Sequence, residues 1–200
     1  MRILLIRHGQ TDANKRNIIQ GWLDFKLNNV GIKQAKLLAK RLKNENIDYF
    51  YSSDLKRAIM TTEEIKKFHP GIDWVKKSII RERNFGRHEG MPVEEYYNLI
   101  KCYGLEVHEF VPPFGESYYD VRRRAEIFFR ELVRKHKKDT VAVIAHGVFN
   151  KAFISQVFDI SLKDAVKIEQ QNTCVNIIEV KSKPKLVSLN DYSHLNGYVF

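Results

Sequence analysis

The sequence predicts an α/β protein, a three-layer α/β/α sandwich around a mixed, mostly parallel sheet. Two short apolar runs, residues 3–6 and 141–145, each lead into a His-Gly pair, which indicates buried strands that feed tight turns. Amphipathic helical patterns alternate with such runs, as in sheets covered by helices. Two hundred residues suit one domain, so we expect a single domain over residues 1–200, with residues 81–116 as an insertion that covers the site.

The first half of the chain carries signals for two helices and a strand. Residues 9–29 hold Gly, Asn and Asp without apolar periodicity, so we expect a loop that crosses the site. Apolar residues then recur at three- and four-residue intervals over residues 31–42, which predicts a helix. Residues 49–51 predict a strand, and residues 52–54 offer side chains that would cap the next helix. That helix is expected over about residues 55–69, with three side chains turned inward: Ile59, Ile65 and Phe68.

The second half alternates helices and strands more clearly. Residues 74–76 predict a short strand, and residues 93–101 predict a short helix within the insertion. Ser117 begins an amphipathic helix, and a second helix follows the second His-Gly pair. The side chains expected on the buried faces are Val121, Ala125, Phe129 and Leu132 in the first of these helices, and Phe149, Ala152, Phe153 and Val157 in the second. Residues 174–180 predict another strand, and residues 186–189 predict an edge strand.

The composition is that of a globular protein. The apolar fraction is 44% and the mean hydropathy is −0.40. No apolar stretch approaches the roughly 18 residues needed to span a bilayer, and Arg7 and His8 interrupt the N-terminal apolar run before a signal-peptide core could form. Cys102 and Cys174 are too few for a disulfide framework. We therefore expect a cytoplasmic protein without a membrane partner.

The charge balance is basic. The net charge is +10, from 34 Lys and Arg against 24 Asp and Glu, and such a surplus is compatible with nucleic-acid binding. The densest basic runs, residues 122–124 and 134–138, lie in one predicted helix and lack the interleaved aromatic residues that stack on bases. An anionic small substrate explains part of the surplus. A nucleic-acid or protein partner is therefore only a secondary alternative.

Several common site motifs are missing. Neither of the glycine-rich nucleotide-binding loops occurs, and there is no Gly-x-Ser-x-Gly nucleophile elbow. His88-Glu89 and His108-Glu109 each begin like the zinc-binding His-Glu-x-x-His helix, but a proline stands four residues after each histidine. The sequence therefore favours a site without a metal.

Histidine and arginine side chains follow the two strands that end in His-Gly. A neutral imidazole is a competent nucleophile toward phosphorus when nearby charges neutralise the phosphoryl group. Arginine suits that task because its guanidinium is planar and permanently charged. Arg7 adjoins His8, and Arg57 falls in the first turn of a predicted helix, whose N-terminus favours an anion. His146 and Gly147 stand at another strand-to-helix junction, where a cationic imidazole and backbone amides would face the same phosphate.

The order of these residues resembles one known family. Residues 7–11, Arg-His-Gly-Gln-Thr, are similar to the Arg-His-Gly-Glu/Gln-Thr/Ser signature of the histidine phosphatase superfamily, the clan of cofactor-dependent phosphoglycerate mutases and related phosphatases. The similarity extends over roughly residues 1–175, and it continues in the family's order at residues 14, 20–22, 52–58, 82–86, 115–117 and 145–147. The resemblance implies a phosphoglycerate mutase-like fold.

The resemblance also implies roles for particular residues. His8 would be the nucleophile that becomes phosphohistidine, and Glu82 would protonate the leaving oxygen and then help to activate water. The residues that would bind the phosphoryl group or lie beside the substrate are Arg7, Asn14, Gln20, Gly21, Arg57, His146 and the Gly147 amide. Arg83 is a further candidate for substrate contact, with a solvated loop position as the alternative. No metal or other cofactor is implied. Ala13 replaces the tryptophan of many relatives, so the substrate-side wall is expected to differ.

The shared phosphohistidine chemistry leaves two reactions open. Transfer of the phosphoryl group from the histidine to water makes a phosphatase, whereas its transfer to a bound phosphoglycerate makes a 2,3-bisphosphoglycerate-dependent mutase. Mutases of the family carry a lysine and paired arginines after the Glu-Arg motif, but residues 91–114 hold Lys101 and no arginine. The resemblance therefore favours a histidine acid-type phosphatase, a phosphoric monoester hydrolase that acts on a small phosphorylated metabolite with sugar-phosphate or broad specificity. The sequence identifies neither the substrate nor the oligomeric state, and a homodimer stays open.

Overall fold

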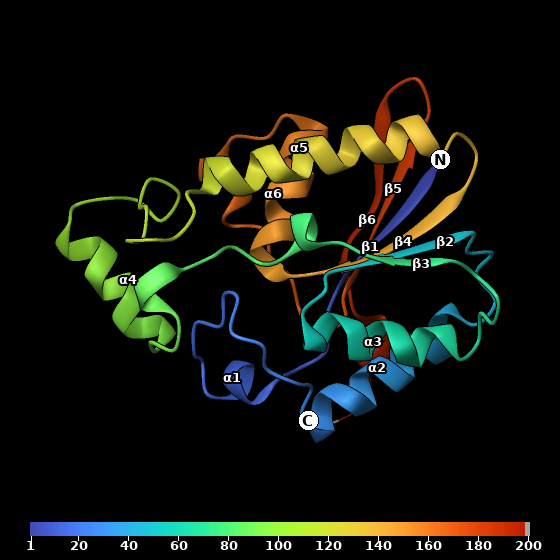
Figure 1. Cartoon of the computed structure of the whole chain (residues 1–200), viewed down its shortest axis with the longest axis horizontal. Helices are drawn as coiled ribbons and strands as arrows, with labels where there is room; N and C mark the ends of the chain where they lie inside the picture. The colour runs from blue at the N-terminus through green and yellow to red at the C-terminus, as the bar shows by residue number, and fades with distance from the viewer. Residues whose placement is uncertain (199–200) are drawn as a thin grey trace.

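Helices cover both faces of a six-stranded sheet in the computed structural model, which describes residues 1–198 (Figure 1). The strand order is β3 (Trp74–Lys76), β2 (Tyr49–Ser52), β4 (Thr140–Ala145), β1 (Arg2–Arg7), β5 (Val175–Val180) and β6 (Pro184–Asp191). The first four of these strands pair in parallel, whereas β5 runs antiparallel to both β1 and β6. The predicted mixed, mostly parallel sheet is therefore confirmed, and β6 is an edge strand as expected.

Two long helices pack on each face of the sheet (Figure 1). One face carries α5 (Tyr118–Lys135) and α6 (Gly147–Phe158), and the other carries α2 (Asn29–Leu42) and α3 (Lys56–Lys66). Successive strand side chains point to opposite faces, so Ile3 and Leu5 of β1 join the core under α5 and α6, while Leu4 and Ile6 join the core above α2 and α3. This explains why β1 is a continuous apolar run, because both of its faces are buried. The three-layer sandwich is confirmed.

Shorter elements complete the chain, and residues 81–116 leave the sheet altogether. These elements are α1 (Asp12–Lys15), α4 (Val93–Cys102), α7 (Leu162–Ala165), and the 3₁₀ turns η1 (Ser78–Ile80), η2 (Gly86–His88) and η3 (Ser193–Leu195). In Figure 1, α4 stands apart from both helical layers. It packs in a separate apolar cluster that includes Ile19, Phe85 and Tyr96. The division into one domain with an insertion stays a prediction. The last two residues of the predicted domain, 199 and 200, lie outside the described residues.

Local capping chemistry explains where the helices begin. Ser117 caps α5 by accepting a hydrogen bond from the Asp120 amide while Asp120 bonds back to the Ser117 amide. Asn28 caps α2 through the Gly31 amide, so this helix begins two residues before the predicted Gly31. All four side chains predicted for the buried face of α6 are buried. None of the helices within residues 1–198 combines the length and the apolar character that crossing a membrane requires.

Some local expectations are wrong. The α3 helix ends at Lys66, so Phe68 lies beyond it and is 46% exposed rather than turned inward. Leu55 is the N-cap of that helix, without a side-chain cap, because Ser53 accepts only from the Leu55 amide and Asp54 pairs with Arg81. Residues 52–54 therefore do not cap α3.

Three further differences concern two short helices and one core position. The segment predicted as a loop contains α1, which Thr11 and Asn14 stabilise by a capping box. The α7 helix was not predicted, since its four residues are too few for a periodic pattern. On α5, Phe128 is fully buried and the predicted Phe129 is only partly buried, whereas the other three predicted side chains are fully buried.

Candidate active site

A cavity of about 230 Å³ opens beside the ends of β1 and β4. Eight of the predicted site residues line it: Arg7, His8, Asn14, Gln20, Gly21, Arg57, Glu82 and Gly147. The two His-Gly pairs meet here because β1 and β4 are adjacent parallel strands whose carboxyl ends lie at one edge of the sheet. The volume lies below the 300–1,000 Å³ usual for drug-sized ligands, which favours a small metabolite.

The imidazole of His8 is neutral and presents one nitrogen as a lone-pair donor. Its Nδ1 lies 2.7 Å from the Gly9 carbonyl oxygen, and because a carbonyl only accepts, Nδ1 carries the proton. Nε2 therefore has a free lone pair. Burial, then the positive charges of Arg57 and Arg7, hold the pKa of His8 well below its ordinary value of 6.5. His8 is thus prepared to act as a nucleophile at neutral pH.

His146 is a neutral hydrogen-bond donor rather than the predicted cation. Arg57 Nε donates to His146 Nδ1 over 3.2 Å, so the ring proton of His146 must reside on Nε2. Burial and the neighbouring charge of Arg57 hold the pKa of His146 well below 6.5. The expectation of a cationic His146 is therefore wrong, because two buried arginines already supply the positive charge. The rings of His146 and His8 lie 5.1 Å apart between centroids.

Two buried N–H groups beside His8 have no hydrogen-bond partner within residues 1–198. They are Nε of Arg7 and Nε2 of His146. A buried donor without an acceptor costs about 1–3 kcal/mol, so these two groups are suited to a ligand that brings acceptors. Three phosphoryl oxygens offer such acceptors.

Arg57 connects the pocket wall to His146. Besides its bond to the imidazole, it donates to the carbonyl oxygens of Leu23 (2.8 Å) and Gly21 (2.7 Å). Burial lowers the pKa of Arg57 to about 10, so the guanidinium remains charged at neutral pH. Arg57 therefore contributes positive charge to the pocket and also fixes the loop that crosses it.

The carboxylate of Glu82 lies at the N-terminus of α6. Its Oε1 accepts hydrogen bonds from the amides of Val148 (3.0 Å), Phe149 (3.1 Å) and Arg83 (3.0 Å). A Cβ atom on Gly147 would lie 3.7 Å from Glu82 Oε2 and 3.6 Å from Arg7 Nε. The carboxylate thus stands next to Arg7 on the cavity wall, within reach of a group bound at His8.

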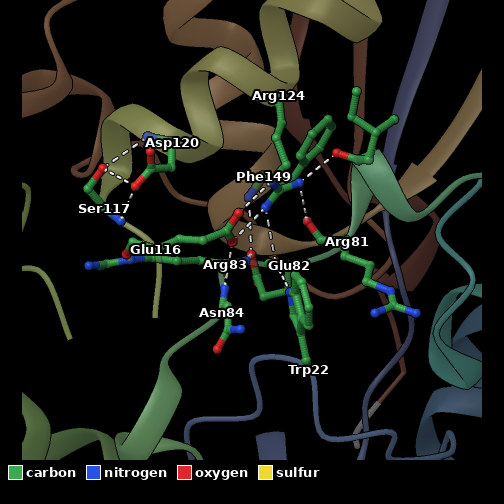
Figure 2. Close-up of polar contacts among 11 residues, drawn as sticks. Trp22, Arg81, Glu82, Arg83, Asn84, Glu116, Ser117, Asp120, Arg124 and Phe149 are labelled. Carbon is green, nitrogen blue, oxygen red and sulfur yellow. Dashed lines mark hydrogen bonds and ion pairs between the residues drawn. The ribbon is translucent and has the colours of Figure 1, made fainter. Parts of the chain in front are cut away.

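A salt bridge holds the backbone that carries Glu82 (Figure 2). Arg124 pairs with Glu116 at 2.7 Å, and it donates to the carbonyl oxygens of Ile79 (2.6 Å) and Glu82 (3.3 Å). Glu116 in turn accepts from the Asn84 amide at 2.8 Å. The Gly-Glu-Ser motif at residues 115–117 therefore serves to position Glu82, and Arg124 is bound there rather than free for substrate.

The loop after β1 is organised around Thr11. Asn14 Oδ1 accepts from the Thr11 amide, and the Thr11 hydroxyl donates to Gln20 Oε1 at 2.9 Å. These bonds occupy the amide oxygens and leave the NH₂ groups of Asn14 and Gln20 for the cavity that both residues line. Gly21 has φ +52°, in the left-handed region, so another residue would be strained there and would displace the Glu89 carboxylate.

Arg83 lies outside the cavity. It is fully buried, donates to the Glu116 carbonyl oxygen at 2.7 Å, and stacks over the Tyr118 ring with its guanidinium carbon 4.4 Å from the centroid. The alternative of a solvated loop position is wrong because Arg83 is fully buried, and substrate contact stays a prediction. It connects the insertion to the start of α5 instead.

Sequence reasoning missed several lining residues, of which Lys151, Tyr97 and Gln170 are polar. Lys151 was detectable, since it stands four residues after Gly147 and so shares a face of the predicted helix. Tyr97 and Gln170 come from the insertion and from the segment before β5, and no motif marks them. Within residues 1–198, no three His, Cys, Asp or Glu side chains are grouped closely enough to hold a metal ion.

Comparisons with known proteins identify the family of this chain. A family model described as histidine phosphatase superfamily (branch 1) matches residues 3–192. A probable phosphatase from Schizosaccharomyces pombe is 36% identical over 98% of this chain and 96% of its own length. Phosphoserine phosphatase 1 from Hydrogenobacter thermophilus is 30% identical over 99% of this chain and 96% of its own length. The solved structure of YhfR from Bacillus stearothermophilus superposes on this chain with a TM-score of 0.89, at 28% sequence identity, over 98% of this chain and 99% of its own.

Proposed function

The chain belongs to the histidine phosphatase superfamily, branch 1, and from this premise we propose that it hydrolyses small phosphate monoesters through a phosphohistidine at His8. One observation carries the proposal. A neutral histidine with a free Nε2 lone pair lies beside two buried N–H groups, of Arg7 and His146, that lack acceptors. In this arrangement the protein supplies the nucleophile and the donors that a phosphoryl group needs. It would act as a histidine acid-type phosphatase.

In the first half-reaction, Nε2 of His8 attacks phosphorus. The new N–P bond forms as the O–P bond to the leaving alcohol breaks, and Glu82, which enters this step as the protonated carboxylic acid, donates its proton to the leaving oxygen. Arg7, Arg57 and the Nε2–H group of His146 stabilise the charge on the transferred phosphoryl oxygens. The bond from His8 Nδ1 to the Gly9 carbonyl stabilises the imidazole as it gains positive character.

In the second half-reaction, water attacks the phosphohistidine. Glu82 accepts the water proton as the new O–P bond forms, and the N–P bond breaks with its electron pair returning to His8 Nε2. Inorganic phosphate leaves and the neutral histidine is restored. The amides of Val148, Phe149 and Arg83 keep the Glu82 carboxylate oriented through both steps.

The positions of the basic residues favour hydrolysis over mutase transfer. Lys101 is exposed near the end of α4 and does not line the cavity. Arg122 pairs with Asp159, and Arg124 pairs with Glu116. None of these three is placed to hold the carboxylate of a phosphoglycerate for retransfer, and the described lining offers the single lysine Lys151 in place of the lysine and paired arginines of mutases.

Product analysis distinguishes the two reactions. We expect phosphate release from p-nitrophenyl phosphate and from a panel of metabolite monoesters, undiminished by a chelator, because protein cations neutralise the phosphoryl charge. Isomerisation of 3-phosphoglycerate primed with 2,3-bisphosphoglycerate should be slower than its hydrolysis. Mutase turnover that exceeds phosphate release would establish the alternative reaction. A loss of activity in the presence of a chelator that added metal restores would contradict the metal-free mechanism.

The two site histidines should stay neutral in mildly acidic solution. Their pKa values are depressed by burial and by neighbouring arginines, so protonation requires a pH well below 6.5. In NMR titrations we expect the rings of His8 and His146 to remain neutral at about pH 6, where unperturbed imidazoles are largely protonated. By linkage, the stability that they contribute is present above about pH 6.5 and is lost as the pH falls below it. Titration of either ring near 6.5 would contradict the neutral-nucleophile assignment.

A further inference from the structure

The cavity continues beyond the phosphoryl-binding residues along α6. Its wall there is largely apolar, with Val148, Ile18 and Val93 among the lining side chains, but it includes one further cation, Lys151. Lys151 follows Gly147 by four residues, so it lies on the same face of the helix about 6 Å further along the axis. A small ligand bound at His8 could therefore reach Lys151 with a group a few bonds from its phosphorus.

Lys151 has no carboxylate bound directly to its ammonium group. Its Nζ donates to the Val166 carbonyl oxygen at 2.8 Å, and in the part of the chain that the structure describes it forms no ion pair. Two exposed lysines at and just after α7 behave differently, since Lys163 pairs with Glu106 at 2.7 Å and Lys167 pairs with Asp164 at 2.9 Å. Burial, together with the charge of Arg7, lowers the pKa of Lys151, against the more distant charges of Glu82 and Glu169, which raise it. A ligand anion would supply a direct counter-charge.

Among the described lining residues, the cavity has no free carboxylate that would pair with a cationic group of a ligand. Glu82 is the one carboxylate among the described lining residues, and its oxygens already accept from backbone amides. The Gln170 side chain is likewise occupied, because its amide oxygen accepts from Asn150 and Asn176. Besides Glu82, the described lining therefore offers no carboxylate to an ammonium or to a second basic group, while it offers the positive charge of Lys151 beyond the phosphoryl subsite.

We propose that Lys151 determines substrate specificity by binding a second anionic group on the carbon skeleton of the substrate. The substrate class is then a phosphate monoester that also carries a carboxylate or a second phosphate, rather than a neutral sugar monophosphate or a phosphorylated amine. This inference rests on the proposed function, because it takes the reacting phosphoryl group to lie at His8.

Binding measurements in an inactive background test the inference directly. His8→Ala protein would be titrated calorimetrically with 3-phosphoglycerate and with glycerol 3-phosphate, which differ by a carboxylate in place of a hydroxymethyl group. We expect 3-phosphoglycerate to bind about 10- to 100-fold more tightly, the effect of one hydrogen bond to a charged group. Lys151→Met should remove that preference, Lys151→Arg should retain it, and the control Lys167→Met, which removes an exposed charge, should leave it unchanged.

Further ligand pairs identify the chemistry of the second group. Fructose 1,6-bisphosphate against fructose 6-phosphate tests a second phosphate in place of a carboxylate. O-phosphoserine against 3-phosphoglycerate tests the ammonium, and we expect phosphoserine to bind more weakly because the described lining has no carboxylate besides Glu82 to pair with its ammonium group. Binding of inorganic phosphate to every variant would verify that each is folded.

The outcomes separate this inference from the proposed function. Two results would overturn the role of Lys151. In the first, the preference for the second anion persists in Lys151→Met. In the second, the His8→Ala parent shows no preference for either the carboxylate or the second phosphate. Turnover of p-nitrophenyl phosphate by the wild-type protein is measured separately. An absence of turnover would overturn the proposed phosphatase activity, while the affinity ratios would still decide whether Lys151 binds an anion.

Discussion

Replacement of His8 by alanine is expected to lower phosphatase turnover by about 10⁴- to 10⁶-fold, as removal of a catalytic nucleophile does in other covalent mechanisms. Alanine offers no lone pair to phosphorus, whereas the remaining donors of Arg7 and His146 still bind phosphate. The loss should therefore appear in kcat much more than in the affinity for inorganic phosphate. Steady-state hydrolysis of p-nitrophenyl phosphate, with phosphate as a competitive ligand, measures both quantities.

A matched histidine control separates nucleophile loss from a general effect. His108 lies in the insertion beside Glu106 and does not line the cavity. His108→Ala should retain turnover within a few-fold of the parent. Turnover by His8→Ala close to that of the wild-type protein would contradict the covalent mechanism, provided that both variants unfold at similar temperatures.

Replacement of Glu82 by glutamine is expected to lower hydrolysis by about 10²- to 10⁴-fold, the usual contribution of a general acid–base group. A glutamine matches the shape of Glu82 but cannot transfer the proton. The effect should depend on the leaving group, because an alkyl alkoxide needs protonation and p-nitrophenolate does not. We expect a larger loss in formation of the phosphoenzyme from glycerol 3-phosphate than from p-nitrophenyl phosphate, measured in single turnovers.

The control for this variant is Glu63→Gln, an exposed position on α3. It removes one carboxylate without touching the cavity, and it should leave both rates unchanged. Equal losses for the two substrates in Glu82→Gln would indicate that Glu82 only caps α6 and transfers no proton, since a capping defect has no reason to follow the leaving group.

Local sequence signals were sufficient for the sheet and for most of the predicted residues that line the cavity. Apolar runs over β1 and β4 specified buried strands, and the His-Gly pairs at their ends met because the strands are parallel neighbours. This pairing brings Arg7, His8 and Gly147 to one cavity, and the family's ordered motifs indicated the other five lining residues. Capping patterns likewise located the start of α5.

Features that depend on distant contacts could not be predicted in the same way. The neutral state of His146 follows from its burial and from the charge of Arg57, 89 residues earlier, and the orientation of Glu82 follows from amides 66 and 67 residues later. The position of Arg83 depends on how the insertion packs against α5, which no periodic pattern encodes. Lys151 was overlooked because a single lysine in an apolar helix resembles an ordinary surface residue until its neighbours are known.

The most direct test of the covalent mechanism is to trap the phosphoenzyme. The protein would be mixed with a labelled phosphate monoester, quenched under alkaline conditions that preserve phosphohistidine, and digested for mass spectrometry. The mechanism predicts one phosphoryl group on the peptide that contains His8, formed within the first turnover and absent from His8→Ala. Phosphorylation of a different residue, or steady hydrolysis with no phosphoenzyme at any time point, would contradict it.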